Sequence, residues 1–206
     1  MKTNFLGMMK LGCILAIFAA TACVMLAFVY SGTSSVIAQR QQADLEAALK
    51  ELFPDADNFE RTDEIKSPDP AVTIESAYAA LKNREVIGAA LNLSRASYSG
   101  PIRTMVGVSA AGIITGVKIM EHSDTPGLGA NAASPSYFVD RANGVTFFGQ
   151  FAGKRVTDPF RVNDDVVVIT ASTVTSNAVS SSVKAAGLAV SEWLKSGIVS
   201  AARGGQ

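Results

Sequence analysis

One uncharged apolar run near the N-terminus constrains this chain more than any other feature. Residues 11–30 read LGCILAIFAATACVMLAFVY and include no Asp, Glu, Lys or Arg. A helix of this length crosses a hydrocarbon core of about 30 Å. The run therefore predicts a transmembrane helix over 11–30. A cleaved signal peptide is the alternative, but its apolar region is typically only about 7–15 residues long and ends at a small-x-small site that is not clear here.

The basic residues around this run predict its orientation. Lys2 and Lys10 precede it, and no basic residue follows before Arg40. Because positive charge is retained on the cytoplasmic side, residues 1–10 are expected in the cytoplasm and residues 31–206 outside it. We expect a single-pass protein of the inner (cytoplasmic) membrane.

The composition excludes several classes of function. Lys and Arg number 18, as do Asp and Glu, so the chain lacks the basic charge of a nucleic-acid-binding protein. Cys13 and Cys23 both lie in the apolar run, which leaves no disulfide, thiolate zinc site, iron–sulfur cluster or cysteine nucleophile for the exported part. His122 is the only histidine, so no metal site is predicted. A hydrolase is disfavoured because no Gly-x-Ser-x-Gly motif accompanies His122, and no catalytic residue is assigned.

The exported part is expected to have a stalk and a body. Leu45, Leu49 and Leu52 recur at helical spacing, which predicts a membrane-proximal amphipathic helix over 39–53 that Pro54 ends. The polar stretch 58–70 resembles a hinge. We therefore assign 31–70 to the membrane-proximal helix and linker, and 71–206 to a globular domain.

The body is expected to have an α+β fold, with a mainly antiparallel sheet and flanking helices. A C-terminal helix is predicted from the face formed by Val179, Val183, Ala186, Val190 and Trp193. Short β-type runs predict strands at 86–93, 102–108, 113–120 and 166–169, of which the second and third form a hairpin.

The junction before the C-terminal helix reads TASTVTSN over residues 170–177 and is rich in hydroxyl side chains. The free amides and the dipole of a helix N-terminus stabilise an anion such as a phosphate. An ordinary Ser/Thr helix cap is the alternative.

Three motifs in this body resemble those of FMN-binding domains. The junction Thr170-Ala171-Ser172-Thr173-Val174-Thr175-Ser176 resembles their Ser/Thr-Gly-Ala-Thr-x-Thr-Ser signature. Residues 122–129 (HSDTPGLG) are similar to a His-x-Glu-Thr-Pro-Gly-Leu-Gly loop, and residues 98–102 (YSGPI) to a Gly-Tyr-x-Gly-Pro-Ile strand entry. The family includes the G subunit of Rnf electron-transport complexes and the C subunit of the sodium-translocating NADH:quinone oxidoreductase. The single anchor and the short chain are closer to the former.

This resemblance implies an FMN that is covalently attached through its phosphate to Thr173. Thr125 would offer the flavin a hydrogen bond, and Leu128 would pack on its ring. For His122 we favour a structural role in the loop. Lys154 and Arg155 would pair with the phosphate or a neighbouring subunit, or stay solvated. The implied cofactor-binding positions are Thr173 with Thr170, Ala171, Ser172, Val174, Thr175, Ser176, Thr125 and Leu128.

The resemblance also implies a role as electron-transfer subunit and redox component of a translocase. Such a complex couples ferredoxin:NAD oxidoreduction to sodium or proton translocation. The partners would be the other membrane subunits and an FMN transferase for maturation. Two alternatives stay open: a C-type subunit of the quinone reductase, and a flavin-free membrane-anchored binding or assembly module.

Three departures from the family pattern keep the flavin-free alternative open, although Thr173 and the flanking Thr175 and Ser176 match the signature. Ala171 stands where the family has Gly, Ser172 where it has Ala, and Val167 where it has Asp. Alanine restricts a turn that requires positive φ.

Overall fold

The computed structural model describes residues 5–203, with side chains over 7–197, and divides them into two compact units that meet between Glu46 and Ala47. The first unit lies within helix α1 (Phe5–Leu52). From Gly7 onward this helix is long and apolar enough to cross a membrane, and none of its most apolar window is buried. An apolar surface of this kind is stable in lipid rather than in water.

Helix α1 corrects the expected separation between a spanning helix and a membrane-proximal helix. The two are one continuous helix that ends at Leu52, just before Pro54. The Ser-Gly-Thr segment after Tyr30 lies within this helix, and the Thr33 hydroxyl donates to the Val29 carbonyl at 2.9 Å.

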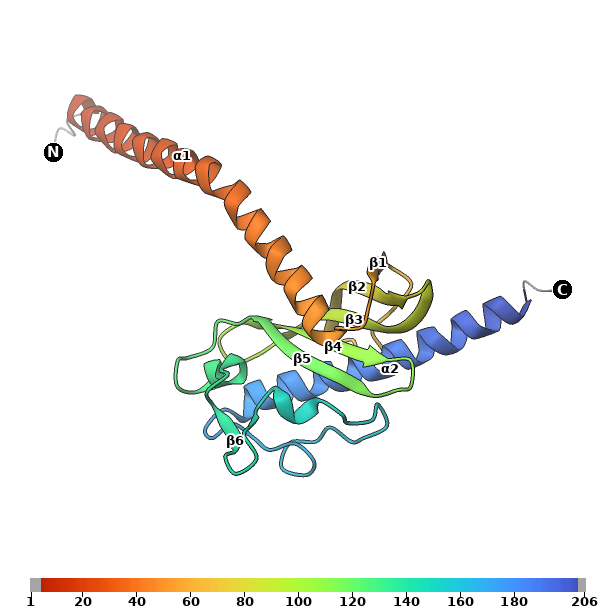
Figure 1. Cartoon of the computed structure of the whole chain (residues 1–206). Helices are drawn as coiled ribbons and strands as arrows, with labels where there is room; N and C mark the ends of the chain where they lie inside the picture. The colour runs from red at the N-terminus through yellow and green to blue at the C-terminus, as the bar shows by residue number, and fades with distance from the viewer. Residues whose placement is uncertain (1–4, 204–206) are drawn as a thin grey trace. The chain divides into compact units, whose positions relative to one another are not determined.

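The second unit contains a five-stranded antiparallel sheet in the order β1-β2-β3-β4-β5 (Figure 1). Each strand pairs with the next one along the chain. The strands are β1 (Asn58–Thr62), β2 (Val72–Lys82), β3 (Glu85–Ala96), β4 (Pro101–Ser109) and β5 (Ile114–Glu121). They are followed by η1 (Gly129–Ala133), the pair β6 (Phe138–Asp140) and β7 (Val145–Thr146), η2 (Gly149–Phe151) and helix α2 (Thr173–Arg203).

Helix α2 packs against one face of this sheet and forms the main core with it (Figure 1). Alternate residues of β4, such as Ile102 and Val106, point to this face and are fully buried. From the helix come Val179, Val183, Ala186 and Val190, all fully buried, as the sequence predicted, while Trp193 is half-buried. This packing fixes the direction in which the first turn of α2 points.

Three glycines lie on the opposite face of the sheet, where side chains would meet the end of α1. Gly88, Gly107 and Gly116 come from three adjacent strands, and a Cβ on each would lie between 2.8 and 3.2 Å from Phe53 or Leu52. The last turn of α1 therefore packs into a strip that only glycine leaves open.

The remaining sequence-based expectations divide into confirmed and wrong ones. β3, β4 and β5 confirm the strands predicted at 86–93, 102–108 and 113–120, with β4 and β5 as the hairpin. The hinge expected at 58–70 is wrong at its start, because β1 pairs there with β2, which the sequence analysis did not identify. Residues 166–169 form no strand: Val166 and Ile169 are buried as loop residues, and only an isolated bridge joins Val166 to Val162.

Candidate functional site

Helix α2 begins at Thr173, within the hydroxyl-rich junction. Thr173 and Val174 are exposed. Among the described residues, none accepts a hydrogen bond from the amides of Thr173, Val174 or Thr175. Three free N–H groups at the positive end of a long helix make a favourable position for an anion.

Ala171, two residues before the helix, has a left-handed backbone with φ 59°. A residue with a Cβ is disfavoured there by roughly 1–2 kcal/mol, whereas glycine is not. The turn therefore does require positive φ, and the alanine in place of the family's glycine leaves it strained.

The hydroxyl groups of the junction fall into two sets. Thr170 and Thr173 are exposed. Ser172, Thr175 and Ser176 are buried. The Ser176 hydroxyl donates to the Ser172 carbonyl at 2.9 Å and accepts from the Ile169 amide at 3.0 Å, which holds the turn closed. Only Thr170 and Thr173 present their hydroxyls for modification.

Asp124 connects this turn to the rest of the domain. Its carboxylate accepts from the hydroxyls of Thr175 and Ser97, each at 2.7 Å, and from the Ser99 amide at 2.9 Å. The Ser172 hydroxyl in turn donates to the Thr175 hydroxyl oxygen at 2.9 Å. Three separate segments, after β3, after β5 and at the start of α2, therefore meet at one carboxylate.

Asp124 carries a negative charge at neutral pH. Burial raises the pKa of its carboxyl, but the hydrogen bonds from Ser97, Thr175 and the Ser99 amide, with the charge of His122, lower it, and the net shift is downward. The close packing here requires a glycine at position 129, because a Cβ on Gly129 would lie 2.6 Å from both the Asp124 Cβ and the Thr175 hydroxyl oxygen.

A pocket of about 500 Å³ opens where these segments meet. Most predicted cofactor-binding residues line it, but Thr170 and Ser176 do not. Tyr98, Asp124 and Gly129 also line it and were not among the predicted residues, although each lies in a motif that resembles the family's. The lining residues are Tyr98, Asp124, Thr125, Leu128, Gly129, Ala171, Ser172, Thr173, Val174 and Thr175.

The chemistry of this pocket fits FMN. Its volume lies in the range that encloses a ligand of this size, roughly 300–1,000 Å³. Tyr98, Leu128 and Val174 are large and exposed, so they offer apolar surface to a flat ring. The free amides at the first turn of α2 can donate hydrogen bonds to a phosphate. An aromatic ring and a phosphate are the two parts of FMN that a protein must hold.

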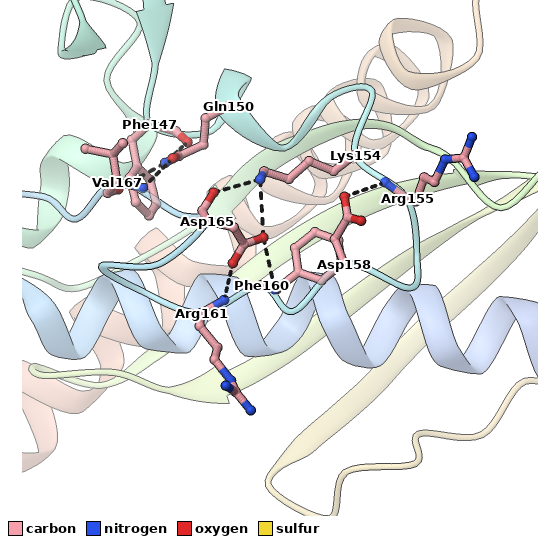
Figure 2. Close-up of polar contacts among 9 residues, drawn as sticks. All are labelled: Phe147, Gln150, Lys154, Arg155, Asp158, Phe160, Arg161, Asp165 and Val167. Atoms are coloured by element: carbon pink, nitrogen blue, oxygen red, sulfur yellow. Dashed lines mark hydrogen bonds and ion pairs between the residues drawn. The ribbon is translucent and has the colours of Figure 1, made fainter.

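Lys154 does not face this pocket but forms an ion pair elsewhere (Figure 2). Its ammonium lies 3.3 Å from the Asp165 carboxylate and donates to the Asp165 carbonyl at 2.7 Å. The same carboxylate accepts from the amides of Phe160 and Arg161. Burial raises the pKa of Asp165, but the Arg161 amide and Lys154 lower it, and the net shift is downward. Asp165 is committed to its loop and does not replace the missing family Asp.

At the position of that missing Asp, Val167 is 53% exposed, and its backbone is held by a side chain (Figure 2). The Gln150 amide group accepts from the Val167 N–H at 2.8 Å and donates to the Val167 carbonyl at 3.1 Å. The Arg155 amide donates to Asp158 at 2.9 Å. His122 is half-buried, and among the described residues its Nδ1 has no hydrogen-bond partner.

Comparison with known proteins gives two family matches. Residues 97–187 match the FMN-binding domain, which covers the pocket and the first turn of α2. Residues 1–52 match the RnfG N-terminal region, which coincides with α1.

Individual relatives match over most of the chain. The G subunit of the Na(+)-translocating ferredoxin:NAD(+) oxidoreductase complex of Acetobacterium woodii is 32% identical over 84% of this chain and 87% of its own length. The G subunit of the Proton-translocating ferredoxin:NAD(+) oxidoreductase complex of Clostridium ljungdahlii is 32% identical over 79% of this chain and 80% of its own. The G subunit of the Ion-translocating oxidoreductase complex of Methanosarcina acetivorans is 28% identical over 80% of this chain and 85% of its own length.

Proposed function

This chain belongs to the family of G subunits of Rnf electron-transport complexes, and from this premise we propose that it carries an FMN attached covalently to Thr173. It serves as an electron-transfer subunit of a ferredoxin:NAD oxidoreductase complex that translocates sodium ions or protons. Its relatives support this assignment, since one is named Na(+)-translocating and another Proton-translocating.

The observation that carries the proposal is the exposure of Thr173 at the start of α2. Its side chain is exposed at the first position of α2, beside three unpaired amides and the pocket. Thr175, the other threonine of the signature within the helix, is fully buried and donates its hydroxyl to Asp124. Of these two threonines, only Thr173 is accessible to a transferase.

Attachment forms a phosphoester and leaves the flavin ring unmodified. The Thr173 hydroxyl oxygen bonds to the flavin-side phosphorus of a flavin dinucleotide donor, the P–O–P bond to the rest of the donor breaks, and the departing nucleotide monophosphate takes up the hydroxyl proton. The product has the mass of the protein plus FMN less one water. The free amides and the helix dipole stabilise the phosphate that remains. When bound, FMN supplies one- and two-electron transfer, while the protein supplies its position and electrostatic surroundings.

The rest of the chain has the role of a tether. Helix α1 anchors the chain in the inner (cytoplasmic) membrane, with its N-terminus in the cytoplasm and the flavin domain outside, as Lys10 before the apolar run supports. Anchoring raises the effective concentration of the flavin beside the other membrane subunits, its electron-transfer partners.

The alternatives differ in what supports them. A C-type subunit of the sodium-translocating NADH:quinone oxidoreductase shares the FMN-binding domain, but the relatives described above are G subunits and the first 52 residues match the RnfG N-terminal region. The flavin-free module remains the alternative outcome of the experiment, because Ala171 strains the turn and Val167 replaces an Asp.

The test is the intact mass of three proteins, each co-expressed with an FMN transferase: the wild type, Thr173→Ala and Thr170→Ala. Thr170 is the matched control because its side chain is also exposed in the same turn. We expect the wild type and Thr170→Ala to gain one FMN less one water and to fluoresce in a gel, and Thr173→Ala to gain nothing. A wild type left unmodified by a transferase that modifies another acceptor would replace this proposal with the flavin-free module.

A further inference from the structure

Asp124 is the one charged side chain among the described residues that line the pocket. It is 5% exposed, and its carboxylate is oriented by three donors. Thr173 lines the same pocket. A flavin attached to Thr173 and seated in this pocket therefore shares a small volume with a buried carboxylate.

No Lys or Arg neutralises the charge of this carboxylate among the described residues. Its three donors, two hydroxyls and an amide, are uncharged groups. Among the described residues, no Lys or Arg lies within ion-pair distance of Asp124, whereas seven other ion pairs do form, including the one between Lys154 and Asp165. The nearby titratable group is His122, two residues earlier in the chain.

A fixed negative charge opposes the arrival of an electron next to it. The opposition is stronger inside a protein than in water, because the effective dielectric constant is lower there. Reduction of a group in the pocket is then less favourable than it would be beside a neutral residue of the same shape. The charge acts on the midpoint potential of the group, and its sign fixes the direction.

From this arrangement we propose that the negative charge of Asp124 lowers the reduction potential of the FMN attached to Thr173. This inference rests on the proposed function. It extends that function because one residue would set the midpoint potential of the flavin relative to those of the other electron carriers in the complex. The hydrogen bonds of Asp124 also hold the first turn of α2, so the experiment must separate its charge from its structural role.

The experiment compares four flavinylated, full-length proteins: the wild type, Asp124→Asn, Asp124→Glu and Asp63→Asn. Asp63 is the matched control because it follows β1, the sheet edge opposite β5, and is exposed. Intact mass gives the FMN content, and spectroelectrochemical titration gives the midpoint potential. We expect a higher potential for Asp124→Asn, and potentials like that of the wild type for Asp124→Glu and Asp63→Asn.

The outcomes keep the two proposals apart. A wild type without FMN contradicts the proposed function, whatever the potentials. A flavinylated Asp124→Asn protein with an unchanged or lower potential overturns the inference about Asp124, since a purely structural role would not raise the potential in Asn and restore it in Glu.

A second variant carries the test if Asp124→Asn does not accept FMN. Ser97→Ala keeps the carboxylate but removes one of the hydroxyl dipoles directed at it. The charge is then less balanced, so we expect the midpoint potential to fall below that of the wild type. An equal or higher potential in Ser97→Ala would overturn the inference.

Discussion

Two aspartates, the buried Asp124 and the half-buried Asp165, hold two loops of the same domain in different ways. Asp165 accepts from two backbone amides and from Lys154, so its charge is matched by a neighbour of opposite sign. Asp124 accepts only from hydroxyls and an amide. A matched charge stabilises a loop and has little effect beyond it, whereas an unmatched charge acts on whatever shares its pocket.

The strongest test of this comparison removes the matched carboxylate. Asp165→Ala leaves Lys154 half-buried without its partner and frees two amides, which should lower the free energy of unfolding by about 3 kcal/mol. The measurement is urea unfolding of the full chain in detergent. Asp158→Ala is the control, because that carboxylate accepts only from the Arg155 amide and should cost about 1 kcal/mol. Equal losses in the two variants would contradict the role given to Lys154.

A substitution beside the unmatched carboxylate should have the next largest effect. Gly129→Ala places a Cβ 2.6 Å from the Thr175 hydroxyl oxygen and the Asp124 Cβ, so these residues must move apart. This should lower the free energy of unfolding by about 2 kcal/mol. Attachment of FMN to Thr173 should decrease with it, as measured by intact mass. Gly197→Ala, at a helical position with open space around it, should leave the flavin content at the wild-type level and should not lower the free energy of unfolding. Full flavin content in Gly129→Ala would show that the cluster does not position Thr173.

Both aspartates predict the same pH dependence of stability. The pKa of each is lowered in the folded protein, so each stabilises the fold above its unfolded pKa of about 4 and loses that contribution as the pH falls through the folded value. Stability should therefore decrease as the pH falls below about 4. Unfolding of the wild type, Asp124→Asn and Asp165→Asn at pH 7 and pH 3 checks this. A variant as acid-sensitive as the wild type would mean that its aspartate does not contribute.

The smallest effect is expected at the turn beside Asp124. Ala171→Gly removes the Cβ from a residue at φ 59° and touches neither carboxylate, so it should raise the free energy of unfolding by about 1 kcal/mol. Thermal unfolding measures the change, and Ala130→Gly, in the short helix η1, should shift stability in the opposite direction. A loss of stability in Ala171→Gly would show that the turn does not hold the left-handed conformation.

The parts of the fold that the sequence predicted depend on neighbours in the chain. Helix α2 was predictable because Val179, Val183 and Val190 repeat at helical spacing, and the β4–β5 hairpin because Gly112 provides the positive φ of its turn. β1 was missed because its polar residues gain strand structure only by pairing with β2. The run 166–169 was misassigned because buried apolar residues also occur in loops whose amides bind side chains, as Val167 binds Gln150.

The candidate site was predictable in part for the same reason. The residues of the turn could be located from their own motif, and the structure places most of them around one pocket. The role of Asp124 could not be predicted from the sequence, because its partners Ser97 and Thr175 lie 27 and 51 residues away and meet it only in the folded domain. The strain at Ala171 was predicted from the glycine that it replaces.

The simple order of the sheet has a consequence for when the protein matures. Each strand pairs with its immediate neighbour in sequence, so the contacts of β1 to β5 are local and can form while the chain is still being made. Helix α2 comes last, and Thr175 reaches Asp124 only when that helix docks. Thr173, the proposed acceptor, would therefore take its final place only when α2 docks, so that flavin attachment would report a completed fold.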